Sequence, residues 1–266
     1  MPTVRSATLR NNACFKVKVV KCRTTLAALV AGVAISGAVA PSTALADYPP
    51  KPKPAPTPAK VAGKWAHPRM ASKIYAKPST SSRKKGRLHF LTEDGFPEVY
   101  KVFGTREVDE VVWVRIGIPA RPNGQTGWVE EESLGEVRTT YRTLTIDRKR
   151  FVARLWENRK DGRRRLLWQS PVGVGAPGTE TPRGNFWIRE RIKGFQTGTI
   201  YGYMAFGTSA YSKLSDWPGG GVVGVHGTNE PWLIPGEISH GCVRVPNKKI
   251  YKLSKVLRIG TPVQIR

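Results

Sequence analysis

The sequence predicts a mainly β protein, in which a small β-barrel precedes a mixed β domain with one late helix. Three observations predict this fold class. Short apolar alternations broken by turn residues fill 63–137. Longer alternating segments follow from about residue 139, and only 247–257 changes to a helical period. These patterns predict domains at 63–137 and 138–266, with segments 1–46 and 47–62 outside both.

The first 46 residues have the order of a secretory signal. A basic stretch ends at Arg23, an apolar run covers 24–40, and small residues at 44–46 precede Asp47. The alternative is an uncleaved membrane anchor. Pro41 closes the run below the ~18 residues that a stable span needs. We therefore expect export, with no stable transmembrane span in the mature protein.

Proline alternates with lysine and small residues from Asp47 to Lys60. Such a density cannot pack a core and favours extended polyproline II. We interpret 47–62 as a semi-rigid, proline-rich tether.

The chain has 44 basic and 19 acidic residues, a net charge of +25. Without the six basic residues of 1–46, the remainder still carries 38 − 19 = +19. That excess favours a polyanionic environment such as nucleic acid, an anionic membrane surface or a cell wall. Export makes nucleic acid an unsuitable partner and leaves anionic wall polymers as the main polyanion.

Five short strands are expected in the first domain, with a tight Pro-Asn-Gly turn at 122–124. Five strands in about seventy residues are typical of a small β-barrel. The expected strands are 73–76, 86–90, 99–103, 111–116 and 126–129.

The second domain is expected to be β-rich, with a turn at 160–163 and a helix over 247–257 that ends at Gly260. In this helix Ile250, Leu253, Val256 and Leu257 fall at helical spacing. The expected strands are 143–147, 151–158, 166–174, 185–191, 221–226 and 262–265.

Cysteine usage indicates where chemistry can occur. Cys14 and Cys22 lie in the expected signal, so Cys242 is the single cysteine of the mature chain. A lone exported thiol cannot form an internal disulfide, so it either reacts or is buried and inert. His226 ends an apolar strand and Cys242 begins another sixteen residues later. Neighbouring strands can bring these two together, and an imidazole pulls a thiol of pKa ~8.5 toward thiolate.

Residues beside this pair have side chains or backbone suited to binding a substrate. Glycine at 227 and 241 allows close backbone approach, and the N–H groups around Gly241 and Cys242 can stabilise an oxyanion. Ser239 and Thr228 offer hydroxyls. Arg244 shares a strand face with Cys242, where its fork of donors can hold a substrate carboxylate.

Three other interpretations of these residues are available. Cys242 can be a buried structural thiol, the better interpretation for an isolated cysteine. A zinc site from His226, His240 and Cys242 is chemically allowed, but no second carboxylate or histidine lies close in sequence to orient it. The GVGAPG stretch at 173–178 fits GxGxxG, yet no helical pattern follows, so we predict a strand end and turn there. No metal or cofactor is expected.

Two stretches resemble known families. WVRIGIPARPNGQTGWV at 113–129 resembles bacterial SH3-like wall-associated modules. HGT at 226–228, followed by SHGCVR at 239–244, is similar to the signature of YkuD-like L,D-transpeptidase catalytic domains. The resemblance covers about 139–266 and includes TPRGNF at 181–186 and GTPV at 260–263. Its combination of several fixed residues is specific.

The resemblance implies a role for each matching residue. Cys242 corresponds to the nucleophile that forms an acyl-enzyme, and His226 to its base. The carbonyl of Gly227 corresponds to the group that orients this imidazole, where some relatives have serine. His240 matches a second histidine that lines the site. Arg244 matches a substrate-facing position where other members have asparagine.

The implied activity is peptidoglycan L,D-transpeptidation in the cell envelope. Cys242 would take the acyl group of a tetrapeptide stem, release its terminal D-alanine, and pass the acyl group to a second stem as a 3→3 cross-link. The alternatives are an L,D-carboxypeptidase that discharges the thioester to water, and a non-catalytic wall-binding protein that acts through its SH3-like domain. Relatives are typically acylated by carbapenems, so such inhibitors are expected partners. The preferred acceptor, the ligand of the SH3-like domain and the oligomeric state are not predicted by the sequence.

Overall fold

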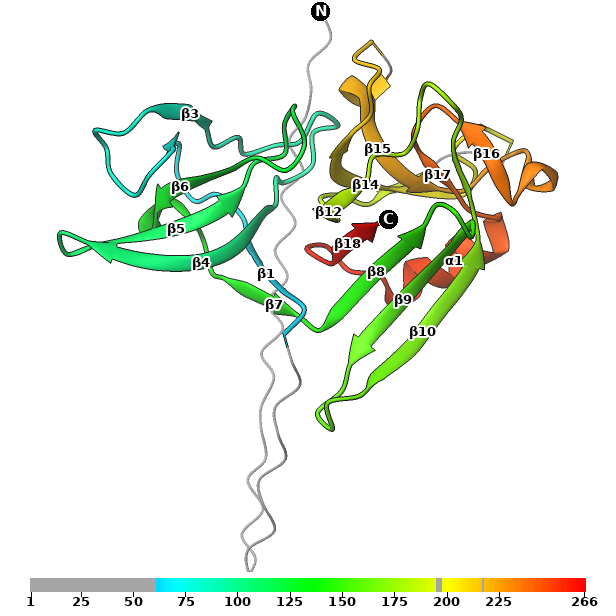
Figure 1. The fold of residues 1–266 in the computed structure, drawn as a ribbon, viewed down its shortest axis with the longest axis horizontal. Coiled ribbons are helices and arrows are strands. Elements are labelled where there is room, and N and C mark those ends of the chain that lie inside the picture. Colours follow the sequence, from blue (N-terminus) through cyan, green and yellow to red (C-terminus); the bar gives the residue numbers. More distant parts are fainter. Residues whose placement is uncertain (1–60, 195–197, 217) are drawn as a thin grey trace, which may run out of the picture. The chain divides into compact units, whose positions relative to one another are not determined.

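A computed structural model describes residues 61–194, 198–216 and 218–266 of the 266-residue chain (Figure 1). The expected signal and tether residues 1–60 lie outside the described residues. The described residues belong to one compact unit. Within these ranges, no helix has both the length and the apolar character that a membrane crossing requires.

The N-terminal part of this unit is a seven-stranded antiparallel sheet of order β3-β2-β6-β5-β4-β1-β7. Its strands are β1 (Gly63–Ala66), β2 (Lys73–Tyr75), β3 (Lys84–Arg87), β4 (Tyr100–Val108), β5 (Val111–Gly117), β6 (Thr126–Glu130) and β7 (Arg138–Thr140), with the 3-10 turn η1 (Glu131–Ser133) after β6. Strands β3 and β7 stand at the two edges. The pairing by itself does not close a barrel, so the SH3-like barrel stays a prediction.

The hairpin of β4 and β5 anchors this sheet. Asp109 and Glu110 connect the strands with φ of 51° and 63°. Positive φ at both turn residues gives the twist that antiparallel strands prefer. Val114 and Ile116 of β5 are fully buried and pack in the local core with Ile74, Leu88, Tyr100 and Val129.

The C-terminal part contains two sheets and the helix α1 (Asn247–Val256) (Figure 1). The first sheet has the order β10-β9-β8-β18-β12 and the second β13-β14-β15-β17-β11-β16. The first comprises β8 (Arg142–Asp147), β9 (Val152–Asn158), β10 (Arg164–Pro171), β12 (Gly184–Trp187) and β18 (Pro262–Ile265). The second comprises β11 (Gly173–Gly175), β13 (Ile192–Lys193), β14 (Met204–Tyr211), β15 (Val222–His226), β16 (Gly236–Ser239) and β17 (Val243–Arg244), with 3-10 turns η2 (Pro218–Gly221) and η3 (Pro231–Leu233).

One core joins the two sheets and the helix. Leu144 and Leu155 come from the first sheet, Phe206 and Val225 from the second, and Leu253 from α1, and all are fully buried. The mainly β fold class with one late helix is therefore confirmed. GxGxxG at 173–178 forms β11 and a turn closed by the Thr179 N–H to Ala176 O bond, as predicted.

Several elements differ from the sequence prediction. Strand β14 was missed because all eight of its residues are buried, so it lacks the alternation of a half-exposed strand. Strands β1 and β16, of four residues each, were also missed. The strand expected at 86–90 lies at Lys84–Arg87, on an exposed edge with little apolar pattern.

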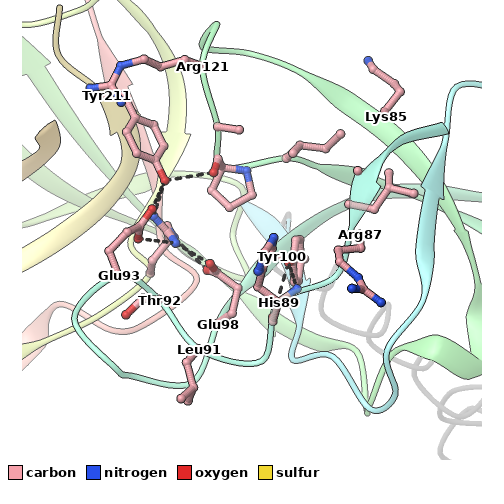
Figure 2. Close-up of a pocket in the computed structure, with 16 residues that line it drawn as sticks. Lys85, Arg87, His89, Leu91, Thr92, Glu93, Glu98, Tyr100, Arg121 and Tyr211 are labelled. Atoms are coloured by element: carbon pink, nitrogen blue, oxygen red, sulfur yellow. Dashed lines mark hydrogen bonds and ion pairs between the residues drawn. The ribbon is translucent and has the colours of Figure 1, made fainter. Parts of the chain in front are cut away.

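A buried ionic network links the N-terminal sheet to β12 and β14 (Figure 2). Arg189, which follows β12, donates to the Glu98 carboxylate at 2.8 Å and to Glu93 at 2.9 Å. Its guanidinium also lies 3.2 Å from the hydroxyl of Tyr211, which contacts Glu93 and lies 3.0 Å from the Pro119 carbonyl oxygen. The network fixes the end of β14, which leads into the candidate site.

Candidate active site

Strands β15 and β17 bring His226 and Cys242 together. They are parallel neighbours, with Val225 opposite Val243 and His226 opposite Arg244. Cys242 immediately precedes β17, and its Sγ lies beside Gly224 in the middle of β15. Both side chains line one small cavity, together with Tyr201, Ser212, His240 and Arg244. We call this the cysteine cavity.

Gly224 makes room between the two groups. A Cβ placed on it would lie 3.6 Å from His226 Cδ2 and 3.8 Å from Cys242 Sγ. Its N–H donates to Cys242 Sγ at 3.3 Å. This glycine was not singled out in the sequence, although glycine inside an apolar strand indicates close approach by another group.

The backbone of Gly227 holds the His226 ring. Its carbonyl oxygen lies 2.6 Å from His226 Nδ1, and the Tyr201 ring meets the imidazole edge-on at 5.2 Å. A neutral imidazole so placed carries its proton on Nδ1 and donates it to the carbonyl. Nε2 is then left as the acceptor.

Burial dominates the electrostatics of the His226–Cys242 pair. Desolvation lowers the pKa of His226 to about 4, with a smaller contribution from the Arg244 charge in the same direction and the Gly227 carbonyl opposing. Desolvation raises the pKa of the Cys242 thiol, against the Gly224 N–H and Arg244, which lower it. Both directions favour a neutral thiol beside a neutral imidazole. Burial therefore opposes the thiolate expected beside His226, and the role of His226 as the base stays a prediction.

Ser239 closes the turn that carries the nucleophile. Its hydroxyl donates to the Cys242 carbonyl at 2.6 Å and accepts the Gly241 N–H at 3.2 Å. Gly241 has φ +120° and is buried against Ser212. The Gly241 N–H is thus already bonded, contrary to the oxyanion role expected for it, and the Ser239 hydroxyl shapes the loop.

Thr228 also serves the loop. Its buried hydroxyl accepts the Glu230 N–H at 3.0 Å, so it is not held open for a ligand as expected. Asn247, at the start of α1, accepts the Thr228 N–H at 3.2 Å and donates to the Thr228 carbonyl at 2.9 Å. Asn247 had no distinguishing signal in the sequence, because its role depends on where the helix begins relative to β15.

Arg244 and His240 complete the cysteine cavity. Arg244 donates to the Glu230 carboxylate at 2.8 Å, so part of the guanidinium fork expected to hold substrate is engaged within the protein. His240 is exposed and lines the cavity. In the part of the chain that the structure describes, no three His, Cys, Asp or Glu side chains are grouped so as to hold a metal ion.

Comparison with known proteins bears on this site. The model of the L,D-transpeptidase catalytic domain, YkuD, matches residues 141–265. Residues 141–265 are therefore similar to the L,D-transpeptidase catalytic domain. Those residues include β15, β17, His226 and Cys242.

Two curated proteins similar to this chain are the L,D-transpeptidase-family YkuD proteins of two Bacillus species. That of Bacillus subtilis is 32% identical over 103 residues, or 38% of this chain and 54% of its own. That of Bacillus licheniformis is 32% identical over 105 residues, or 39% of this chain and 55% of its own. The chain thus spans about half the length of the curated relatives it matches.

Solved L,D-transpeptidases also align with the chain. One from Mycobacterium smegmatis is 15% identical, with a TM-score of 0.36, and covers 63% of this chain and 99% of its own. One from Xylanimonas cellulosilytica is 26% identical, with a TM-score of 0.33, and covers 48% of this chain and 61% of its own.

Proposed function

We propose that this protein is a peptidoglycan L,D-transpeptidase that works through a Cys242 thioester. The observation that carries the proposal is the pairing of β15 and β17, which sets His226 and Cys242 in one cavity inside the family-matched segment. The proposed catalytic residues are Cys242, His226 and Gly227, with His240, Gly241, Ser239, Arg244 and Thr228 shaping the site.

The first half-reaction releases D-alanine. Cys242 Sγ forms a bond to the carbonyl carbon of the L-centre residue before the terminal D-alanine, and the thiol proton moves to His226 Nε2. The tetrahedral adduct collapses with cleavage of the peptide bond. The leaving amine takes the proton from His226, so D-alanine departs and a thioester remains.

The second half-reaction passes the acyl group to an amine. An amine of another stem attacks the thioester carbonyl, and His226 Nε2 accepts its proton. The carbon–sulfur bond breaks, the proton returns to sulfur, and a 3→3 cross-link results. The thioester retains the acyl-transfer energy of the cleaved amide, so the chemistry proceeds without nucleotide hydrolysis.

Neutral resting groups fit this cycle. An imidazole with a pKa of about 4 stays unprotonated and able to accept a proton at neutral pH. The Gly227 carbonyl interacts favourably with the imidazolium that forms during proton transfer. The Gly224 N–H stabilises negative charge on Sγ as the thiol proton leaves.

The organisation proposed for the chain places this activity in the cell envelope. Residues 1–46 would be a signal peptide, 47–62 a tether, 63–137 an SH3-like domain and 138–266 the catalytic domain. The mature net charge of +19 would favour retention among anionic wall polymers.

Product analysis tests the proposal. Purified protein incubated with disaccharide tetrapeptides should yield cross-linked dimers and free D-alanine by mass spectrometry. Tripeptide without dimers would contradict transpeptidation and indicate an L,D-carboxypeptidase. Binding to wall material with no product of either kind would instead indicate a non-catalytic wall-binding protein.

A further inference from the structure

A wide hollow adjoins the cysteine cavity. It has a volume of about 700 Å³ and shares Ser212 with that cavity. A Cβ placed on Gly241 would lie 2.9 Å from Ser212 Cβ and 3.6 Å from the Thr179 carbonyl oxygen. The residue before the nucleophile is therefore packed against the wall that separates the two spaces.

The hollow is built by both parts of the compact unit. Asn123, between β5 and β6, bonds to the Tyr211 carbonyl at 2.8 Å and accepts the Tyr211 N–H at 2.9 Å. Arg121 donates to the carbonyls of Ser212 at 3.1 Å and Leu214 at 2.8 Å. These bonds fix the loop of the N-terminal sheet against the end of β14, so the hollow has a firm wall.

The charge of the hollow is strongly positive. Four cations, Arg121, Arg148, Arg183 and Lys213, line it together with one carboxylate, that of Glu180. Lys213 pairs with Glu180 at 2.9 Å and holds the pKa of that carboxyl at about 2. Arg121 already donates to two backbone carbonyls, so two of the three arginines in the hollow remain to bind a ligand.

Arg148 and Arg183 are the cations that remain for a ligand. Nε of Arg148 is buried and has no hydrogen-bond partner within the described ranges. Arg183 is exposed, and no ion pair to it occurs among the described residues. Arg148 likewise has no ion pair among the described residues.

We propose that this hollow, the basic groove, binds a carboxylate of the stem peptide while Cys242 attacks, with Arg148 and Arg183 as its ligands. The inference rests on the proposed function. Guanidinium forks match carboxylates, and the volume suits a short peptide. Ser212 lines both the groove and the cysteine cavity, so the occupant of the groove is inferred to be part of the peptide that reacts over this shared wall. The carboxylate is one other than that of the departing D-alanine, and the N-terminal sheet becomes a wall of the substrate site.

Two matched peptides test the inference. One tetrapeptide keeps its internal carboxylates, and the other has them converted to amides. Amidation is expected to raise the wild-type KM about 10-fold with little change in kcat. The Arg148→Gln/Arg183→Gln variant should show that higher KM with both peptides. Removing the arginines and removing the carboxylate abolish the same interaction, so the two changes should not add in a double-mutant cycle.

A charge-matched control variant distinguishes binding in the groove from general electrostatic attraction of the peptide to a positively charged protein. Arg159→Gln/Arg163→Gln removes two arginines that pair with Asp161 in the turn before β10, outside the groove. It should leave KM and the preference between peptides unchanged. An equal rise in KM in this control, or no wild-type preference for the carboxylate form, would overturn the inference.

A binding measurement distinguishes failure of the inference from failure of the proposed function. Calorimetry on the Cys242→Ala protein compares the same two peptides without turnover. If wild type turns over neither peptide but Cys242→Ala still prefers the carboxylate form about 10-fold, the groove stands and the proposed activity falls. Equal affinities there, or stronger competition by a polymeric phosphodiester than by the peptide, would contradict the groove's assignment.

Discussion

The cavity that holds Cys242 is small and buried, whereas the basic groove on the other side of Ser212 is wide and charged. In the cavity, desolvation favours neutral forms of both titratable groups. In the groove, four cations face one carboxylate. This difference fits the two proposed roles. Proton transfer between neutral partners needs shielding from water, whereas recognition of an anion needs charges that a ligand can reach from solvent.

The comparison predicts that substitutions on the two sides of Ser212 affect different kinetic constants. Cys242→Ser is expected to lower kcat by about 10³-fold or more, because a hydroxyl ionises far less readily than a thiol. Arg183→Gln, in the groove, should change KM and leave kcat within about twofold. Released D-alanine measures both. Residual Cys242→Ser turnover within tenfold of wild type would remove the covalent scheme.

Burial of His226 predicts a loss of stability in acid. The unfolded imidazole takes up a proton as pH falls through about 6.5, while the folded one stays neutral until about pH 4. Its contribution to the free energy of unfolding is therefore full above pH 6.5 and declines toward pH 4, by up to about 3 kcal/mol. Urea denaturation of wild type and His226→Gln at pH 7.5, 5.5 and 4.5 measures this decline.

The stability difference between wild type and His226→Gln should change over that pH range, with wild type losing more on acidification. A constant difference would show that the ring is not held neutral by burial.

Substitution of Gly241 should have a smaller effect, a loss of stability that comes from backbone strain and from a close contact. Gly241→Ala adds a Cβ 2.9 Å from Ser212 at φ +120°, which should reduce the free energy of unfolding by about 1–3 kcal/mol. Gly162→Ala is the matched control, because Gly162 also has positive φ, +79°, but nothing within 4 Å of its Cβ position. Chemical denaturation compares the two. Equal losses would show that the wall at Ser212 is not tightly packed.

Salt should produce the smallest change. Raising ionic strength from about 0.05 M to 0.5 M should raise KM a few-fold, because the exposed charges of the groove are screened. The buried cysteine cavity should be little affected, so kcat stays constant. Initial rates of D-alanine release test this. A fall in kcat with constant KM would contradict the assignment of substrate binding to the groove and of chemistry to the cysteine cavity.

Alternating patterns predicted the elements that expose one face. Strands β8 and β9 and the hairpin of β4 and β5 lie close to the expected positions, and α1 begins at the expected Asn247. Strand β14, buried on both faces, has no such pattern. It nevertheless pairs with β15 and ends beside the cysteine cavity, so the least predictable strand positions part of the site.

The site itself was only partly predictable. Spacing and residue type predicted that His226 and Cys242 lie close together. The two strands at these residues, β15 and β17, do pair. The hydrogen bonds of Ser239 and Gly241 depend on a turn that residue identity does not specify. The basic groove collects Arg121, Arg148, Arg183 and Lys213 from distant segments, so in sequence they were indistinguishable from a solvated charged face.

Intact-mass spectrometry of the protein quenched during turnover of a tetrapeptide tests the central claim most directly. The account predicts an adduct with the mass of the acyl tripeptide, mapped by peptide sequencing to Cys242 and discharged by an added amine. D-alanine should appear in solution in equal amount. Release of D-alanine with no adduct on any time scale, or an adduct on another residue, would contradict the proposed nucleophile.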